Sequence, residues 1–191
     1  MTKKTNRAHN KSQKIAACVF DLGNGKYSAT LKRGQKFRSL IVDVNEERSV
    51  ALGLCPTLIM LPWSFAPLEV DTFNIVSGRE ATAILLEEAA KKGIKANAAE
   101  FCFNYEGFGV DKGTAFLPTR LELAQVASHQ KTIEDMLTVI GYNKCNYTFW
   151  SSSVCNDDAT VWMMSMSSYS ISGYKQQSQT FGVMPMIEIV L

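Results

Sequence analysis

Residues 162–166, Trp-Met-Met-Ser-Met, decide the predicted fold, and they lie in a C-terminal segment, 149–191, that is rich in serine and aromatic residues. Successive side chains of an extended strand point to opposite faces of a sheet, so Trp162, Met164 and Met166 would share one face. This alternation is typical of a strand that is buried on one face only. We expect the buried set to continue at Ile171 and in a last strand with Val183, Pro185, Ile187 and Ile189.

The other face of this segment, with the loop that leads to it, carries mainly small and polar residues. Tyrosine gives a large contact area at a small cost in entropy, and serine and asparagine form adaptable hydrogen bonds, as they do in antibody loops. We therefore expect a ligand to bind over residues 154–178. The candidate ligand-binding residues are Val154, Asn156, Asp157, Asp158, Thr160, Met163, Ser165, Ser167, Ser168, Tyr169, Ser170, Ser172, Tyr174 and Gln176.

The N-terminal part of the chain, residues 15–70, has the pattern of short strands joined by turns. Strands are expected at residues 15–22, 27–31, 37–44 and 49–54. The pair Asn24-Gly25 is a strong signal for a two-residue hairpin turn. A proline-rich loop follows, in which we interpret Trp63 as a core residue.

Capping signals predict three helices in the middle of the chain. Ser77 with Glu80, and Thr119 with Glu122, have the spacing of a capping box, in which each residue bonds the backbone of the other. The helices are expected from Ser77 to Gly93, from Thr119 onward, and over residues 132–140 before Gly141. Residues 97–114 are expected to form a glycine-rich loop. Strands, helices and strands in that order indicate an α+β protein.

Length and composition fit an ordinary globular domain. The chain has 191 residues, of which 46% are hydrophobic and 20% charged, and its net charge is +2. Residues 1–14 are basic and poor in apolar residues, so we expect a disordered arm before a single domain at 15–191. The rest of the chain is slightly acidic, which argues against a nucleic-acid partner.

Cysteine and histidine residues form no pattern typical of a metal or catalytic site. Five cysteines are scattered without a C-x-x-C pair, which indicates free thiols, with one disulfide as an alternative. His9 and His129 have no evident nucleophile or metal partner in the sequence. Asp157 and Asp158 alone are poor evidence for calcium. No P-loop, G-x-S-x-G or H-E-x-x-H motif is present, so we expect no enzymatic activity, cofactor or metal.

Several motifs in the second half of the chain occur in the order of a known family. They are Cys102-Phe103-Asn104-Tyr105, Phe116-Leu117-Pro118-Thr119-x-x-Glu122-Leu123, Ile140-Gly141, Phe149-Trp150-Ser151-Ser152-Ser153, Trp162 to Met166, and Val183-Met184-Pro185-Met186. Together they resemble a bacterial and phage family with a C-type-lectin-like fold. That family includes Lcl C-terminal-type domains, Bacteroides major-paralogous domains and variable proteins of diversity-generating retroelements. Met184 departs from the family pattern, which has arginine there.

The resemblance implies a C-type-lectin-like fold with an N-terminal β-rich extension. It also implies that the surface could be diversified, because the retroelements of that family randomise adenines in codons such as AAC. Most of the candidate ligand-binding residues are of the types that such randomised codons encode. The pattern is compatible with diversification, and equally with an ordinary serine-rich strand.

The sequence therefore predicts a binding protein whose ligand is a protein or glycan on another cell or particle. The chief alternative is a structural subunit of a virion or surface appendage, in which the same surface packs against a neighbouring chain, including a second copy. An enzyme on the same fold is the least favoured alternative. No signal peptide or membrane span is evident. We therefore expect synthesis in the cytoplasm, followed by virion association or export by another route.

Overall fold

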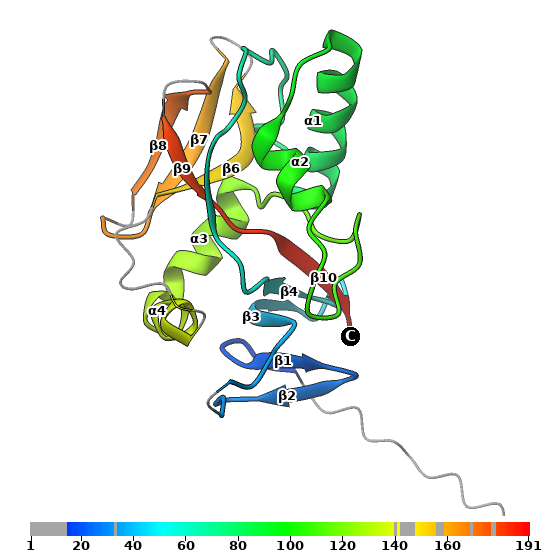
Figure 1. The fold of residues 1–191 in the computed structure, drawn as a ribbon, viewed down its shortest axis with the longest axis vertical. Helices are drawn as coiled ribbons and strands as arrows, with labels where there is room; N and C mark the ends of the chain where they lie inside the picture. The colour runs from blue at the N-terminus through cyan, green and yellow to red at the C-terminus, as the bar shows by residue number, and fades with distance from the viewer. Residues whose placement is uncertain are drawn as a thin grey trace, which may run out of the picture.

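The computed structural model describes residues 15–32, 34–139, 141, 148–155, 159–168, 170–176 and 179–191. Within these ranges the chain forms two five-stranded sheets and four helices (Figure 1). The predicted α+β class is confirmed, with strands predominating. The arm predicted at residues 1–14 lies outside the described residues.

The first sheet, sheet A, is built mainly from the N-terminal part of the chain. Its strands in spatial order are β10 (Met186–Val190), β4 (Val50–Leu54), β3 (Ser39–Asn45), β1 (Phe20–Gly23) and β2 (Lys26–Ser28). Asn24 and Gly25 have φ values of 53° and 69°, as a type I′ turn between β1 and β2 requires. The predicted hairpin and the predicted strand pair that follows it are confirmed.

The second sheet, sheet B, contains most of the C-terminal segment. Its strands in spatial order are β5 (Ile59–Pro62), β9 (Thr180–Val183), β6 (Thr148–Cys155), β7 (Thr160–Ser165) and β8 (Ser170–Lys175). All neighbours are antiparallel except β6 and β9, which are parallel. β5 lies where a loop was predicted. This strand has four residues and ends at Pro62, which is too short for a periodic signal.

The end of the chain passes from one sheet to the other. The predicted last strand is in fact two strands, β9 in sheet B and β10 in sheet A, separated by Met184 and Pro185. Val183, Pro185, Ile187 and Ile189 are buried as predicted, but Met184 and Met186 are buried as well. Both faces of this segment are covered, because it runs between the sheets and packs against both.

Two helices confirm the capping signals. α1 (Gly78–Lys92) begins after Ser77, whose side chain accepts a bond from the Glu80 amide, and ends at Gly93 with φ 65°. α3 (Arg120–Ser128) begins after Thr119 with a complete capping box. α4 (Gln130–Val139) follows α3 almost directly and confirms the third predicted helix.

The fourth helix, α2 (Asn97–Phe103), corrects the prediction that residues 97–114 form only a loop. It has seven residues and no side-chain cap at Ala96, so the sequence carries no start signal. Packing holds it instead, since Ala98, Ala99 and Cys102 are buried in the core. The glycines after α2 do form the predicted loop, with positive φ at Gly107, Gly109 and Gly113.

The helices cover both faces of sheet B. α1 and α2 lie on one side of it, and α3 lies between sheet B and sheet A (Figure 1). The core under α1 and α2 includes Trp63, which is fully buried as predicted, and Trp150, which is fully buried as well. The core around α3 and α4 includes Phe149, Met164, Met166 and Met184. In the part of the chain that the structure describes, no helix is long and apolar enough to cross a membrane.

Candidate functional site

The predicted binding residues centre on the hairpin of β7 and β8, at one edge of sheet B. The two strands pair in register, with Val161 opposite Tyr174, Met163 opposite Ser172, and Ser165 opposite Ser170. Opposite residues on neighbouring strands point to the same face of a sheet. The predicted outward set therefore does share one face, and Met164 shares the other face with Ile171.

The inward set confirms the predicted alternation. Met164 and Met166 are buried, and Ile171 packs against the same core. Trp162 is half-buried, and its ring lies 5.5 Å from that of Phe73 in the connection before α1. The guanidinium of Arg120 in turn lies 4.2 Å from the Phe73 ring, so the start of α3 covers this side of β7.

Three of the candidate ligand-binding residues are core residues, which corrects the prediction. Val154 is fully buried and Met163 is 8% exposed, both in the core under α1 and α2. About half of the outward face of β7 is thus buried in the core under α1 and α2. The continuous apolar run from Val161 to Met164 is typical of a strand that is covered on both faces.

Gln176 is the third corrected residue, because its side chain is 1% exposed and is used for structure. Its Oε1 accepts a bond from the Leu68 amide at 2.6 Å, and its Nε2 donates to the Leu68 carbonyl at 2.9 Å. Ser64 Oγ also donates to Oε1 at 3.3 Å. Gln176 therefore ties the end of β8 to the proline-rich connection, and its buried side chain does not face a ligand.

The remaining described candidates form an accessible surface along β8. We name it the β8 edge surface, and it comprises Ser165, Ser167, Ser168, Ser170, Ser172 and Tyr174, all half-buried or exposed. Two pairs of its hydroxyls contact each other, Ser165 with Ser167 at 3.2 Å and Ser168 with Ser170 at 2.6 Å. Thr160 is half-buried at the other end of β7. Asn156, Asp157, Asp158 and Tyr169 lie outside the described residues.

Tyr174 is the one large side chain of this surface. It is 39% exposed and meets the Phe181 ring edge-on, with 5.5 Å between the ring centroids. Phe181 in turn lies 4.5 Å from the ring of Trp150 in the core. This chain of aromatic contacts fixes the Tyr174 ring while leaving part of it accessible.

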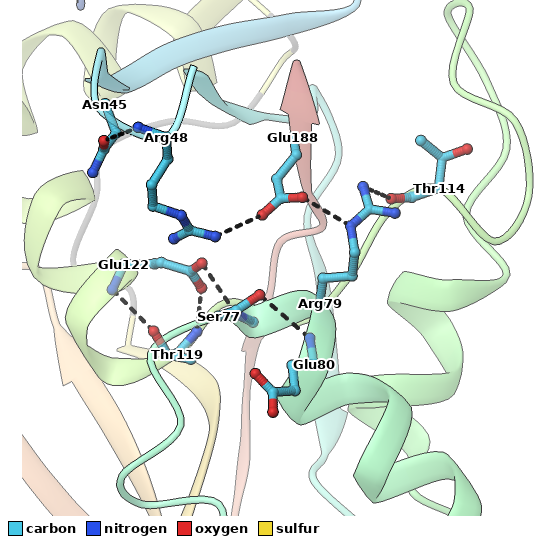
Figure 2. Close-up of polar contacts among 10 residues, drawn as sticks. Asn45, Arg48, Ser77, Arg79, Glu80, Thr114, Thr119, Glu122 and Glu188 are labelled. Atoms are coloured by element: carbon cyan, nitrogen blue, oxygen red, sulfur yellow. Dashed lines mark hydrogen bonds and ion pairs between the residues drawn. The ribbon is translucent and has the colours of Figure 1, made fainter. Parts of the chain in front are cut away.

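The Leu-Pro-Thr-x-x-Glu motif has a structural role away from the β8 edge surface. Glu122 accepts bonds from the amide of Thr119 at 2.7 Å and from the amide of Gly78 at 3.1 Å, so one carboxylate caps both α3 and α1 (Figure 2). Burial raises the pKa of Glu122, although these amide bonds oppose the shift. A Cβ at Gly78 would lie 2.7 Å from the Phe116 ring and 2.8 Å from the Leu117 carbonyl, which explains the glycine there.

A polar cluster beside this cap links β10 to α1. Glu188 of β10 pairs with Arg79 at 3.0 Å and with Arg48 at 3.8 Å (Figure 2). Both arginines are about half exposed, so these ion pairs contribute little to the free energy of unfolding. The charge of Glu188 nevertheless lies on the edge strand of sheet A.

A second candidate site, which the sequence did not indicate, lies between the helices and the hairpin. The junction of α3 with α4 and the inner face of β7 and β8 form the walls of an open surface cavity of about 860 Å³. Its walls include His129, Gln130, Lys131, Glu134, Met164 and Ile171. Most of the lining comes from residues 124–134, and Met164 and Ile171 of the hairpin complete it. No sequence motif marks these residues.

His129 has a nucleophile as its partner, contrary to the prediction. Its Nδ1 lies 3.1 Å from Sγ of Cys18, just before β1. The two residues are 111 positions apart, so only the fold brings them together. Cys18, Cys55, Cys102 and Cys155 are free thiols. Among the described residues, no three His, Cys, Asp or Glu side chains form a group that could hold a metal ion.

Comparison with solved structures gives a likeness in fold to a fimbrial protein. No family model and no curated protein match the chain. It is similar to the crystal structure of a fimbrial protein from Bacteroides ovatus ATCC 8483, with 11% sequence identity and a TM-score of 0.63. The likeness covers 92% of this chain and 49% of that one, so the chain spans about half of its length. At this identity it shows a distant relation in fold alone, and it does not confirm the C-type-lectin-like fold.

Proposed function

We propose that this protein is a structural subunit of a surface appendage and that it packs against a neighbouring copy through the β8 edge surface. The observation that carries the proposal is the open edge of sheet B at β8. The likeness in fold to a fimbrial protein supports it, because that protein belongs to the same broad class of assembly. The proposal is the structural alternative that the sequence left open.

Unpaired edge strands are places where another chain can add to a sheet, since their outer backbone groups lack partners. Proteins that must stay apart shorten such edges, add charges or cover them. β8 has six residues, and its one charged residue is Lys175 at the end. Within the described residues it pairs with β7 and with no other strand. It therefore lacks most of these protections.

The other three sheet edges are better protected. β2 has three residues and begins with Lys26, and β5 has four residues, ends in proline and contacts α2. β10 carries Glu188, and Met186 at its start is bridged to Phe116. β8 is thus the longest of the four edges, and its one charged residue lies at its end. This contrast favours β8 as the contact between subunits.

Charged substitutions on β8 test the proposal. In the double variant Ser170→Lys, Ser172→Lys, two like charges would face their copies across the contact, which costs several kcal/mol in a protein interface. We expect the variant to keep its melting temperature and to self-associate at least about tenfold more weakly in sedimentation velocity.

The matched control adds the same charge away from sheet B. Thr30 and Thr138 are both exposed, so the double variant Thr30→Lys, Thr138→Lys should associate like the wild type. Equal association of both double variants would contradict the proposal. So would a wild-type chain that stays monomeric at every concentration.

A ligand-binding role for the same surface is the second candidate, favoured by its serine and tyrosine composition. It includes the hypothesis of a retroelement variable protein. A reverse-transcriptase gene beside this one, with a near-repeat of its 3′ end that differs at adenines, would support that hypothesis. Tyr174→Ala separates the two candidates, because a binder should lose its ligand and keep its assembly state.

A further inference from the structure

We propose that the neighbouring copy receives β8 on β5, the opposite edge of sheet B, so that sheet B continues from one subunit into the next. The inference rests on the proposed function, because it names the surface that the β8 edge contacts. It makes the contact head-to-tail, with two different surfaces on each copy.

The symmetry of the contact decides whether the copies stop at a pair or form a filament. If β8 of one copy pairs with β8 of another, the two-fold contact uses the same surface twice and closes as a dimer. A contact between two different surfaces leaves one of each free at the ends, so it can be repeated. A subunit of an appendage therefore needs a second surface that is complementary to β8.

The directions of the strands in sheet B make β5 a suitable partner. β5 and β9 are antiparallel, β9 and β6 are parallel, and β6, β7 and β8 alternate in direction. The two edge strands, β5 and β8, therefore run in opposite directions. When a second copy lies beside the first in the same orientation, its β5 is antiparallel to β8, which is the slightly more stable kind of pairing. Because sheets twist, repetition of this contact gives a helical filament.

One row of paired residues crosses the whole of sheet B and shows which side chains would meet. Each residue of the row pairs with the next on the neighbouring strand: Met60 of β5, Gly182 of β9, Phe149 of β6, Met164 of β7 and Ile171 of β8. Paired residues point to the same face of a sheet, so Met60 and Ile171 are the two ends of one uncharged row. A second copy that lies level with the first places its Met60 opposite Ile171.

Met60 and Ile171 are both incompletely covered within one copy. Met60 is 45% exposed, and Ile171 is half-buried. Ile171 also forms, with Met164, the apolar wall of the open surface cavity beside α4. The Met60 side chain of the next copy would lie against this wall, and a methionine side chain is flexible enough to fit an irregular surface. The contact thus removes exposed apolar area from water at both edges.

The neighbouring row lies on the other face of the sheet and gives a second set of contacts. With Met60 opposite Ile171 in an antiparallel pair, Ile59 is opposite Ser172. Ile59 is 37% exposed. Tyr174 lies diagonally across from Ile59, at a distance that an aromatic side chain can bridge. The exposed apolar side chains on both faces of β5 therefore find partners on β8.

β5 is a short edge, but none of its residues is charged. Its sequence is Ile-Met-Leu-Pro, whereas β2 carries Lys26 and β10 carries Glu188. Charged residues on an edge repel an added strand, and proline removes a backbone donor. The proline affects only the end at Pro62, whose carbonyl accepts a bond from Asn97 at 3.4 Å. The part of β5 at Ile59 and Met60 has neither protection.

Complementary variants test the contact by sedimentation velocity. Met60→Lys adds a charge to β5, and Ser170→Lys, Ser172→Lys adds charges to β8 that would lie against the apolar edge of β5. We expect each variant alone to self-associate at least about tenfold more weakly than the wild type. An equimolar mixture should form a heterodimer that does not grow, because the intact β8 of one variant meets the intact β5 of the other.

The outcomes separate this inference from the proposed function. If Met60→Lys associates like the wild type while the β8 variant does not, β8 has another partner, so the inference is overturned and the proposed function stands. The same conclusion follows if both variants are weakened and their mixture forms no heterodimer. If the β8 variant associates like the wild type, the proposed function fails and the inference fails with it.

Val190→Lys is the matched control for Met60→Lys. Val190 is an apolar residue on an edge strand of sheet A and is 83% exposed. The variant receives the same charge and should associate like the wild type. A loss of association in this variant alone would place the contact on sheet A and overturn the inference.

A disulfide test of the register does not depend on the charged variants. A Met60→Cys chain is mixed with an Ile171→Cys chain and oxidised, and the cross-linked peptides are identified by mass mapping. We expect the bond between positions 60 and 171 to predominate, because directly opposite residues have Cβ atoms about 4.5–5.5 Å apart. Bonds from 60 to 60 or from 171 to 171 in equal yield would overturn the head-to-tail contact.

Discussion

Glu122 shows, at the scale of single residues, how much one side chain can organise. The sequence predicted its capping box with Thr119, because the spacing of three residues is local. Its bond to the Gly78 amide joins positions 44 apart and could not be predicted, since it depends on how α1 and α3 meet. The Leu-Pro-Thr-x-x-Glu motif thus has a structural role that does not depend on ligand binding.

Glu122→Gln should lower the free energy of unfolding by about 1–2 kcal/mol, because the new amide group would face backbone donors. Burial raises the pKa of Glu122 above its usual value of 4.5, so the native state holds this proton more tightly than the unfolded chain. Protonation of Glu122 therefore adds to the free energy of unfolding at low pH. This contribution is lost as the pH rises through 4.5 toward the raised pKa of Glu122. The difference between wild type and variant should therefore shrink with rising pH in urea titrations.

Gln176 supplies a second prediction at this scale. Gln176→Ala leaves the amide and carbonyl of Leu68 buried without their partners, so we expect a loss of about 2 kcal/mol in urea unfolding. Ser168→Ala on the same hairpin is the control and should change stability by less than about 0.5 kcal/mol, since Ser168 is exposed. A neutral Gln176→Ala variant would instead restore Gln176 as a candidate contact residue.

At the scale of elements, helices and strands were predicted correctly from the sequence where their signals were local. Asn24-Gly25 and the caps at Ser77 and Thr119 are local, and the hairpin and helices they predicted are present. α2 and β5 have no such signals: α2 forms because it packs against the core of sheet B, and β5 because it pairs with β9. The alternation on β7 predicted which residues share a face, but not that α1 and α2 cover the second face at Met163. The Cys18–His129 contact had no sequence signal at all.

The register of β7 and β8 allows a direct test of this asymmetry. Met163 and Ser172 are opposite each other on the same face, yet Met163 lies under the helices and Ser172 lies at the open edge. We expect Met163→Ala to cost about 2–4 kcal/mol of stability and Ser172→Ala less than about 0.5 kcal/mol. Thermal unfolding of the two variants measures the difference. Similar small effects would mean that the helices do not cover β7.

At the scale of the whole molecule, the end of the chain joins the two sheets. β9 pairs with β5 and β6, and β10 pairs with β4 only a few residues later. α3 adds a second link, because it contacts β3 of sheet A as well as β6 and β7 of sheet B. Because these links join the two sheets, we expect both sheets to unfold together.

We therefore expect a single cooperative unfolding transition. Trp63, Trp150 and Trp162 all lie in or against sheet B, so their fluorescence reports on that sheet. Hydrogen exchange of the β3 and β4 amides reports on sheet A. The two midpoints in denaturant should coincide, and a separation of more than experimental error would show that the sheets unfold independently.

The crossing of the C-terminal segment between the sheets also has a mechanical consequence. A pull on the chain beyond Leu191 acts along β10, whose five residues pair with β4 side by side. The force is then shared by all bonds of this pair at once, so they resist as a group and do not open one after another. Only after β10 slides would the load reach β9 and sheet B. For a pull applied at this end of the chain, sheet A would thus shield sheet B from extension.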